Sequence, residues 1–323
     1  MVQEEIERFH ETFHRIEQQI NRTIIGQEHV VRHVLMAVIA GGNVLLEGAP
    51  GLGKTELVKT LATALDLSYA RIQFTPDLMP TDITGTMVVE QQNGQMSFRF
   101  QKGPLFHSLI LADEINRASP KTQSALLEAM QEKTVTVGNE TYRLPDMFFV
   151  LATQNPLEME GTFPLPEAQL DRFMMKLVLT MPGMEQLLHI LDLTTGQSTA
   201  PVREKVLNGQ QLQRMRQIAC DIPAAEEVRR YAVRLIMETH PEHSSSELVR
   251  EYVAAGASLR GAQALVMGAK IQALAEGRFH VSRHDIQTLA IPCLRHRIFL
   301  RYAASAMRVR PDDIIEQVLA KVE

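Results

Sequence analysis

The sequence predicts an α/β fold in which a parallel β-sheet lies between helices and is followed by an all-helical region. Two observations lead to this prediction. Short apolar segments alternate with helix-forming segments from residue 43 to about residue 180, and this alternation is typical of parallel sheets with helices on both faces. After Pro182 the strand-like segments stop and helical periodicity takes over. We therefore expect two domains, 1–190 and 191–323.

The expected elements follow from apolar periodicity. Apolar runs predict strands at 44–46, 69–74, 109–112, 148–152 and 175–179. An amphipathic helix is expected over 3–20, because its apolar residues recur every three or four positions. Further helices are expected at 56–65, 121–131, 184–193, 209–220, 224–240, 259–276, 283–301 (interrupted by Pro292) and 311–321. Ser282 and Asp285 form a helix-capping signal.

Two β-hairpins are predicted in addition to the sheet. Segments 87–90 and 96–100 flank Asn93-Gly94, and segments 134–137 and 141–144 flank Gly138-Asn139. Both dipeptides are strong two-residue turn signals. A parallel sheet of this type needs neither hairpin, so we interpret both as insertions with a task of their own.

A glycine-rich segment carries the most specific chemical signal in the chain. Its residues are Gly48, Ala49, Pro50, Gly51, Leu52, Gly53, Lys54 and Thr55, with Glu56 directly after them. The segment fits the phosphate-loop pattern and lies between a predicted strand and a predicted helix, as that motif requires. Glycines let backbone N–H groups surround phosphates, and the helix N-terminus adds partial positive charge. Lys54 is expected at the β- and γ-phosphates, and Thr55 at Mg²⁺.

Two carboxylates end the predicted strand at 109–112. With a phosphate loop upstream, Asp113 is expected to orient Mg²⁺ and Glu114 to polarise the attacking water. Asn155 follows the next predicted strand, where an amide can hydrogen-bond the γ-phosphate or that water. Arg172 permits two interpretations, an internal ion pair or an arginine that reaches the γ-phosphate of a neighbouring subunit.

Together these segments resemble the AAA+ ATPases, and among them the MoxR family. The resemblance covers residues 24–310 and rests above all on Gly48–Thr55, on Leu-Ala-Asp-Glu-Ile-Asn-Arg-Ala at 111–118, on 121–131 and on 166–173. It implies an AAA+ P-loop core followed by a C-terminal helical lid domain. It further implies an ATPase that uses Mg²⁺, works as a homo-oligomeric ring, expected to be a hexamer, and acts as a chaperone for a client protein. A partner with a von Willebrand factor A domain is also implied.

The resemblance assigns further residues to the nucleotide site. Gly26 and Gln27 would line the adenine site, Asn155 would be sensor 1, and Arg172 would be the arginine finger. Arg260 would be the sensor 2 arginine of the lid. The family pattern at that point is Ser-Pro-Arg-Ala, whereas this chain has Ser-Leu-Arg-Gly. The two hairpins would face the central pore or the partner.

Composition limits the functional class. The chain has 323 residues, a formal charge of −5 and 45% hydrophobic residues, values ordinary for a soluble globular protein. No apolar run reaches the roughly 20 residues of a membrane span. The acidic balance argues against a dedicated nucleic-acid binder. The N-terminus lacks an apolar signal region, and Cys220 and Cys293 fit reduced, buried thiols, so we expect a cytoplasmic protein without a membrane partner.

Three other functions stay open on the sequence. They are a nucleotide-dependent switch or scaffold, a nucleic-acid motor, and a motor subunit that inserts a metal into a tetrapyrrole. Residues 278–310 contain seven arginines and one acid, Asp285, which fits either solvated helix faces or a docking surface. The spacing of His280, His284 and His296 does not fit a zinc motif, and we expect surface and capping roles for them.

Overall fold

The computed structural model describes residues 2–92, 95–156, 161–195 and 204–322. Its centre is a five-stranded, wholly parallel sheet in the order β2-β5-β8-β1-β9. The strands are β1 (Asn43–Glu47), β2 (Tyr69–Gln73), β5 (Leu109–Asp113), β8 (Phe149–Gln154) and β9 (Phe173–Val178). All five predicted strands are therefore confirmed, with ends that differ by no more than two residues.

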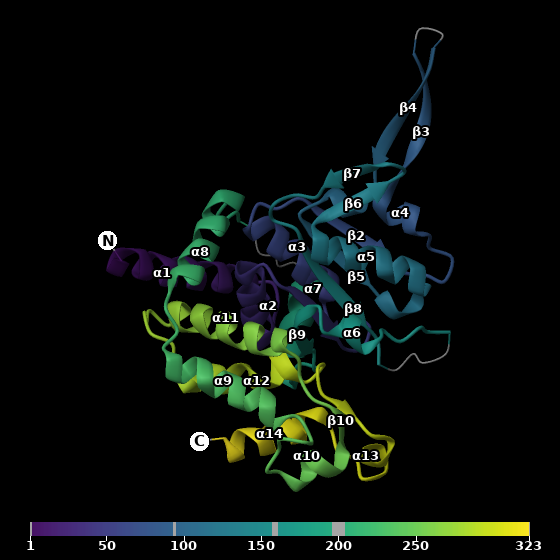
Figure 1. Cartoon of the computed structure of the whole chain (residues 1–323). Helices are drawn as coiled ribbons and strands as arrows, with labels where there is room; N and C mark the ends of the chain where they lie inside the picture. The colour runs from purple at the N-terminus through teal and green to yellow at the C-terminus, as the bar shows by residue number, and fades with distance from the viewer. Residues whose placement is uncertain (1, 93–94, 157–160, 196–203, 323) are drawn as a thin grey trace.

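Helices cover both faces of this sheet, as Figure 1 shows. The helices of this part of the chain are α1 (Val2–Asn21), α2 (Glu28–Ala40), α3 (Lys54–Ala64), α4 (Pro80–Thr84), α5 (Pro120–Glu132) and α6 (Glu167–Leu170). The apolar stripe of α1 is buried, with Phe9, Phe13 and Ile16 each at most 1% exposed. Helix α2 was not predicted from the sequence, because it is apolar on most sides and so has no clear amphipathic period.

Both hairpins form outside the central sheet. Strands β3 (Gly85–Gln92) and β4 (Gln95–Lys102) pair over their whole length and project from the body (Figure 1). The turn residues 93–94 lie outside the described residues. Strands β6 (Thr134–Val137) and β7 (Glu140–Arg143) form the second hairpin, with Gly138 at φ 62° in its turn. Phe100 of β4 stacks on Tyr142 of β7 at 4.2 Å between ring centroids, so the hairpins support one another.

The C-terminal part is mostly helical. It contains α7 (Met184–Thr195), α8 (Gly209–Asp221), α9 (Glu226–Glu238), α10 (Glu247–Tyr252), α11 (Leu259–Ala275), α12 (Arg283–Leu294), α13 (Tyr302–Ala306) and α14 (Pro311–Lys321). A short antiparallel pair, β10 (Val253–Ala255) with β11 (Phe299–Leu300), interrupts the helices. The prediction of an entirely helical region was wrong here. The helix expected to reach Arg301 ends at Leu294, because the chain must turn to pair with β10.

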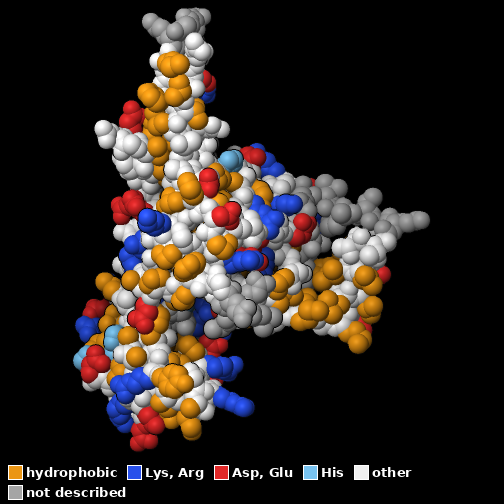
Figure 2. Space-filling model, turned by 90° about the vertical axis from the view of Figure 1, so that its right-hand side faces the viewer, with side chains coloured by type: hydrophobic (Ala, Val, Ile, Leu, Met, Phe, Trp, Pro, Cys, Tyr) orange, Lys and Arg blue, Asp and Glu red, His pale blue; other side chains and the backbone are white. Residues whose placement is uncertain are grey.

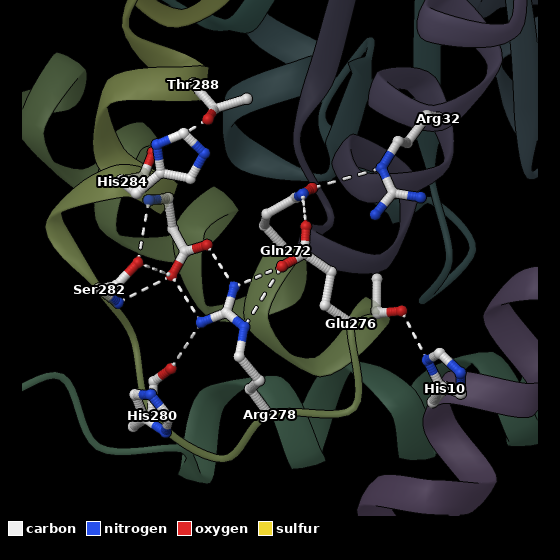
Figure 3. A network of polar contacts seen from close by, with 11 residues as sticks. His10, Arg32, Gln272, Glu276, Arg278, His280, Ser282, His284 and Thr288 are labelled. Carbon is white, nitrogen blue, oxygen red and sulfur yellow. Dashed lines mark hydrogen bonds and ion pairs between the residues drawn. The ribbon is translucent and has the colours of Figure 1, made fainter.

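A polar network ties this C-terminal part to α1 and α2 (Figure 3). Arg278 donates to both oxygens of Asp285 at 3.0 and 2.5 Å and also pairs with Glu276. His10 of α1 contacts the carbonyl oxygen of Ala275 at 2.7 Å. Burial alone would raise the pKa of Asp285, but hydrogen bonds from Arg278 and Ser282 outweigh it and hold that pKa below its usual value. The capping signal of Ser282 and Asp285 is confirmed.

The arginine-rich segment 278–310 is held largely by internal pairs. Arg283 pairs with Glu227, Arg295 with Asp312, Arg297 with Asp171 and Arg310 with Asp313. Two smaller predictions were wrong. His296 is only 4% exposed, because it packs under β9 and not on the surface, and Cys220 is exposed, whereas Cys293 is buried as expected. No helix among the described residues is long and apolar enough to cross a membrane.

Candidate active site

The phosphate loop joins the end of β1 to the start of α3. Gly51 and Gly53 adopt φ values of 84° and 76°, a left-handed region that favours glycine. A Cβ added to either would meet no atom within 4 Å, so the backbone there is open to an incoming group. Lys54 is the first residue of α3, and its Nζ donates to the Gly48 carbonyl oxygen at 2.6 Å. The loop therefore curls around the lysine.

The remaining residues of the loop lie where the motif predicts. Ala49, Pro50 and Leu52 continue the turn between β1 and α3, and Thr55 and Glu56 are the second and third residues of that helix. Burial lowers the pKa of Lys54, while the carboxylates of Asp113 and Glu114 act in the opposite direction. The lysine and both acids therefore share one electrostatic environment, although β1 and β5 are not adjacent strands.

A single hydroxyl fixes the two carboxylates at the end of β5. Thr153 of β8 donates through Oγ1 to Asp113 Oδ1 at 2.6 Å and accepts from the Glu114 amide at 2.8 Å. Thr153 was not predicted as a site residue, because only the pairing of β5 with β8 brings it to this position. The same pairing places Asn155 beside the acids, one residue after β8 ends.

Glu114 has a backbone conformation that is costly for a residue with a side chain. Its φ is 57°, and such outliers cost of order 1–3 kcal/mol and cluster at functional sites. The turn directs the carboxylate to Gln73 Nε2 at 3.0 Å and to Arg117 NH1 at 3.1 Å. Arg71 binds Asp113 at 2.6 Å. Gln73 and Arg71 both come from β2 and carry no motif, so the sequence offered no signal for them.

Asn155 lines a cavity of about 320 Å³ between the sheet and the C-terminal helices. It is 5% exposed. The same cavity is lined by Asn116, Lys176 and His296. His296 Nε2 faces the Phe173 carbonyl oxygen at 2.9 Å, and burial lowers the pKa of this imidazole well below its usual value. Asn155, which is expected beside the γ-phosphate, therefore lines one cavity together with residues of the C-terminal part.

Gly26 and Gln27 lie at the same edge of the sheet as the phosphate loop. Gln27 is 3% exposed and donates through Nε2 to the Thr180 carbonyl oxygen at 2.6 Å, just past the end of β9. Gly26 has φ 76°, and a Cβ there would lie 2.7 Å from Gln186 Oε1 and 3.0 Å from Pro182. This close approach fits a backbone segment that lines a base-binding site.

Arg172 and Arg260 lie at the other edge of the sheet. Asp171, two residues before β9, accepts from Ser258 at 2.7 Å and from Arg297 at 2.9 Å, and lies 3.4 Å from Arg260 NH1. Arg172 NH1 donates to the Leu127 carbonyl oxygen at 2.8 Å, and its Nε has no partner among the described residues. The strands are parallel and start at this edge, so the two arginines are separated from Gly48 by the length of a strand.

These residues fit a magnesium nucleotide. Open glycines surround the expected phosphate positions, a lysine lies among them, and a hydroxyl and a carboxylate supply the oxygen ligands that Mg²⁺ prefers. Thr55 and Asp113 would hold the metal. Groups of three or more metal-binding side chains of the kind a zinc site needs are absent from the described part of the chain.

Comparison with known proteins agrees with this geometry. Residues 43–175 match the model of the ATPase family associated with various cellular activities (AAA), and residues 245–318 match the AAA lid domain. The chain is 40% identical to Chaperone MoxR1 of Mycobacterium tuberculosis over 94% of this chain and 80% of that one. It is 31% identical to Protein MoxR of Paracoccus denitrificans over 93% and 92%.

A solved structure shares the whole architecture. The crystal structure of a protein from Cytophaga hutchinsonii superposes with a TM-score of 0.92 at 40% identity, covering 99% of this chain and 97% of that one. The matches to the AAA domain, to the lid domain and to the MoxR relatives all agree with a nucleotide site at the carboxyl ends of the strands. This chain is a member of the MoxR family of AAA+ ATPases, and its activity is the hydrolysis of ATP.

Proposed function

We propose that this ATPase works as a hexameric ring that remodels protein complexes, with each nucleotide bound between two subunits. The observation that carries the proposal is the position of Arg172 and Arg260. Six residues of β9 separate Asp171 and Arg172 from the carboxyl edge, a span of about 20 Å at the rise of an extended strand. An arginine side chain cannot cross that span, so both arginines can reach a nucleotide only in a second copy.

The residues of one subunit bind the nucleotide and prepare water for attack. Lys54 and the amides of the phosphate loop neutralise the phosphates, and Gly26 and Gln27 line the base. Mg²⁺, held through Thr55 and Asp113, would polarise the β- and γ-phosphates. Glu114, once released from Arg117 and Gln73, takes the proton of the attacking water. Asn155 orients that water or the γ-phosphate.

The neighbouring subunit completes the site. Arg172 supplies positive charge as the γ-phosphate leaves, and Arg260 binds the same group from the lid. Arg260 is 45% exposed at its side chain, which fits a residue that serves a second copy. Asp171 links the two arginines, because it precedes Arg172 in the chain and its carboxylate contacts Arg260 of the lid. A movement of the lid in one subunit can therefore change the nucleotide site of the next subunit. The proposal also includes the domain boundary near residue 190, with the core before it and the lid after it.

The β3–β4 hairpin is the proposed contact with a client protein. Directly paired residues share a face, and the pairs Val89–Phe98 and Gln91–Met96 put Val89, Phe98 and Met96 on one face at 58%, 76% and 78% exposure. Figure 2 shows this apolar stripe along the projecting hairpin. Methionine-rich exposed surfaces suit varied apolar partners. The relative named Chaperone MoxR1 supports the same role.

The alternatives receive less support. Relatives are named as a chaperone and as MoxR proteins, which does not favour a motor for metal insertion into a tetrapyrrole. Glu114 and its supporting hydroxyl are in place, which argues against a switch without turnover. A partner with a von Willebrand factor A domain stays an expectation from the family resemblance.

The mass of the Glu114→Gln variant by light scattering, with and without Mg-ATP, tests the ring. This variant should bind ATP and retain it, so a shift from a smaller species to a hexamer only with Mg-ATP is the expected result. Lys54→Ala is the matched control, because it should not bind nucleotide and should not shift. A Glu114→Gln protein that stays monomeric with bound ATP would remove the basis for a shared site.

A further inference from the structure

Helix α7 exposes an apolar face that the described residues do not cover. None of its residues is buried, and Met184, Leu188 and Leu191 are 78%, 51% and 53% exposed. Their spacing of three and four places them on one side of the helix. In Figure 2, α7 stands out from the body as a largely apolar projection. An apolar helix face of this kind marks an interaction site.

A second exposed apolar patch lies on the lid. Val233 and Met237 of α9 are 46% and 47% exposed, and Leu259 at the start of α11 is 69% exposed. The end of α9 packs on the start of α11, because Thr239 Oγ1 accepts from the Ala257 amide at 2.9 Å. A Cβ on Gly261 would lie 3.1 Å from Ile236. These contacts bring the end of α9, which carries Met237, beside the start of α11, which carries Leu259 and Arg260.

The two patches carry opposite charge at their margins. The α7 face is flanked by exposed acids, Glu185 and Asp192, and the described residues provide no ion pair for either. The exposed side of α9 presents Arg229 and Arg234 beside Val233. Complementary charge around an apolar centre is the usual arrangement of a specific interface. Acidic margins also argue against a membrane surface, which attracts helices with basic margins.

The patches lie at opposite ends of β9. Helix α7 begins six residues after β9 ends, on the side of the phosphate loop. The start of α11 is tied to Asp171, two residues before β9, by the hydrogen bond from Ser258. The patches are different surfaces, so a contact between them in two copies is heterologous, and it forms a ring where the rotation between neighbouring copies closes. In such a contact, the amino edge of one subunit faces the carboxyl edge of the next. Arg172 and Arg260 at the amino edge would then approach the phosphate loop of the neighbouring subunit.

We propose that the apolar face of α7 docks on the Val233–Met237–Leu259 patch of the adjacent subunit. This inference rests on the proposed ring and adds the contact that holds it. Pro182 lies two residues before α7 and Gln186 lies in its first turn, and both lie close to Gly26 at the expected adenine site. Nucleotide binding would therefore position the docking helix. The position of the neighbour's lid would then depend on the bound nucleotide in two ways. One is the α7 contact, and the other is the approach of Arg260 to the γ-phosphate.

Single substitutions in the Glu114→Gln background test the contact. Leu191→Glu and Met237→Glu each place a charge in one patch and leave the other patch intact. Each should raise the protein concentration needed for ring formation in Mg-ATP by at least about tenfold, the effect of losing one buried apolar anchor. Phe279→Glu is the control, because Phe279 is 60% exposed at the other end of α11. ATP affinity, measured at protein concentrations below those at which the parent forms rings, should be unchanged in all three, which also shows that they fold.

A mixture of the two variants gives a sharper result. Leu191→Glu protein retains the lid patch, and Met237→Glu protein retains α7, so together they can form one intact contact. The expected product is a dimer of one copy of each that does not close. Rings of normal mass from either variant alone, or no dimer in the mixture, would overturn the docking contact while leaving the ring intact. A monomeric Glu114→Gln parent would overturn both.

Discussion

The two edges of the central sheet carry different kinds of functional residue. At the carboxyl edge, Asp113 ends β5, Glu114 and Asn155 each come directly after a strand, and Lys54 comes at the end of the phosphate loop that follows β1. Each of these residues is therefore placed by the end of a strand that the sequence predicts. At the amino edge, Asp171, Ser258, Arg260 and Arg297 come from segments up to 126 residues apart. The first edge is built by strand topology and the second by the docking of the lid. The residues of the carboxyl edge that are expected to bind and hydrolyse the nucleotide therefore come from the core alone, whereas the positions of the arginines at the amino edge depend on how the lid packs against the core.

The largest predicted difference is between a variant that cannot bind ATP, Lys54→Ala, and a variant that binds ATP but hydrolyses it slowly, Arg172→Ala. Lys54→Ala should abolish productive ATP binding, because the phosphates lose their central cation. Arg172→Ala should bind ATP normally yet hydrolyse it roughly 10³–10⁵-fold more slowly, the range for arginines of this type. Equilibrium binding of a fluorescent ATP analogue and steady-state phosphate release check the two variants. Full turnover in Arg172→Ala would break the comparison of the edges.

Mixing experiments sharpen the same comparison. Glu114→Gln and Arg172→Ala subunits are each expected to be inactive alone. In a mixed ring, a subunit with Glu114 can lie next to one with Arg172, so part of the activity should return. Glu114→Gln mixed with Lys54→Ala, Arg172→Ala double-variant subunits provides the control without any complete site. Activity that does not recover in the first mixture would argue that Arg172 acts within its own subunit.

The next largest expected effect is on the free energy of unfolding, and it comes from the ion pair that joins the lid to the amino edge of the sheet. Asp171→Ala removes the carboxylate partner of Arg297, which is 3% exposed. Loss of one partner from a buried pair costs about 3–5 kcal/mol. Denaturant unfolding should show this loss, with Asp146→Ala as a surface control. An unfolding free energy equal to that of the parent would mean that the backbone contacts of Arg297 suffice.

A smaller effect concerns pH. The pKa of His296 in the folded protein lies well below 6.5 because the ring is buried. As the pH falls through about 6.5, the unfolded chain gains a proton at this residue that the native state does not. Stability should therefore fall below that pH, and His296→Gln should reduce the slope between about pH 6.5 and 5. An unchanged slope in denaturant midpoints would show that other groups set the acid sensitivity.

The smallest effect on basal chemistry is expected at the hairpin. Phe98→Ser should leave ATP hydrolysis without a client unchanged, because Phe98 is 76% exposed on the β3–β4 hairpin, outside the central sheet. Its loss should instead reduce binding of an apolar client or its stimulation of the ATPase. Phe100→Ser is a useful comparison, since Phe100 stacks on Tyr142 and supports the hairpin itself. A drop in basal turnover for Phe98→Ser would place the hairpin in the catalytic cycle.

The sequence alone determined the core strands, the phosphate loop and the acids at the end of β5. These features depend on apolar runs and on residues adjacent in the chain, so local patterns carry them. Both hairpins were predicted for the same reason, because a two-residue turn is a local signal. The long amphipathic helix α1 was also predictable, since its buried stripe follows a helical period.

Only the tertiary structure decided what lies between the elements. Thr153 reaches Asp113 because β5 pairs with β8, and Gln73 reaches Glu114 because β2 lies beside β5. The burial of His296, the short β10–β11 pair and the grouping around Asp171 depend on how the lid packs. These contacts join residues far apart in the chain and of types common everywhere. Their positions follow from the free energy of the whole fold, and no local pattern records them.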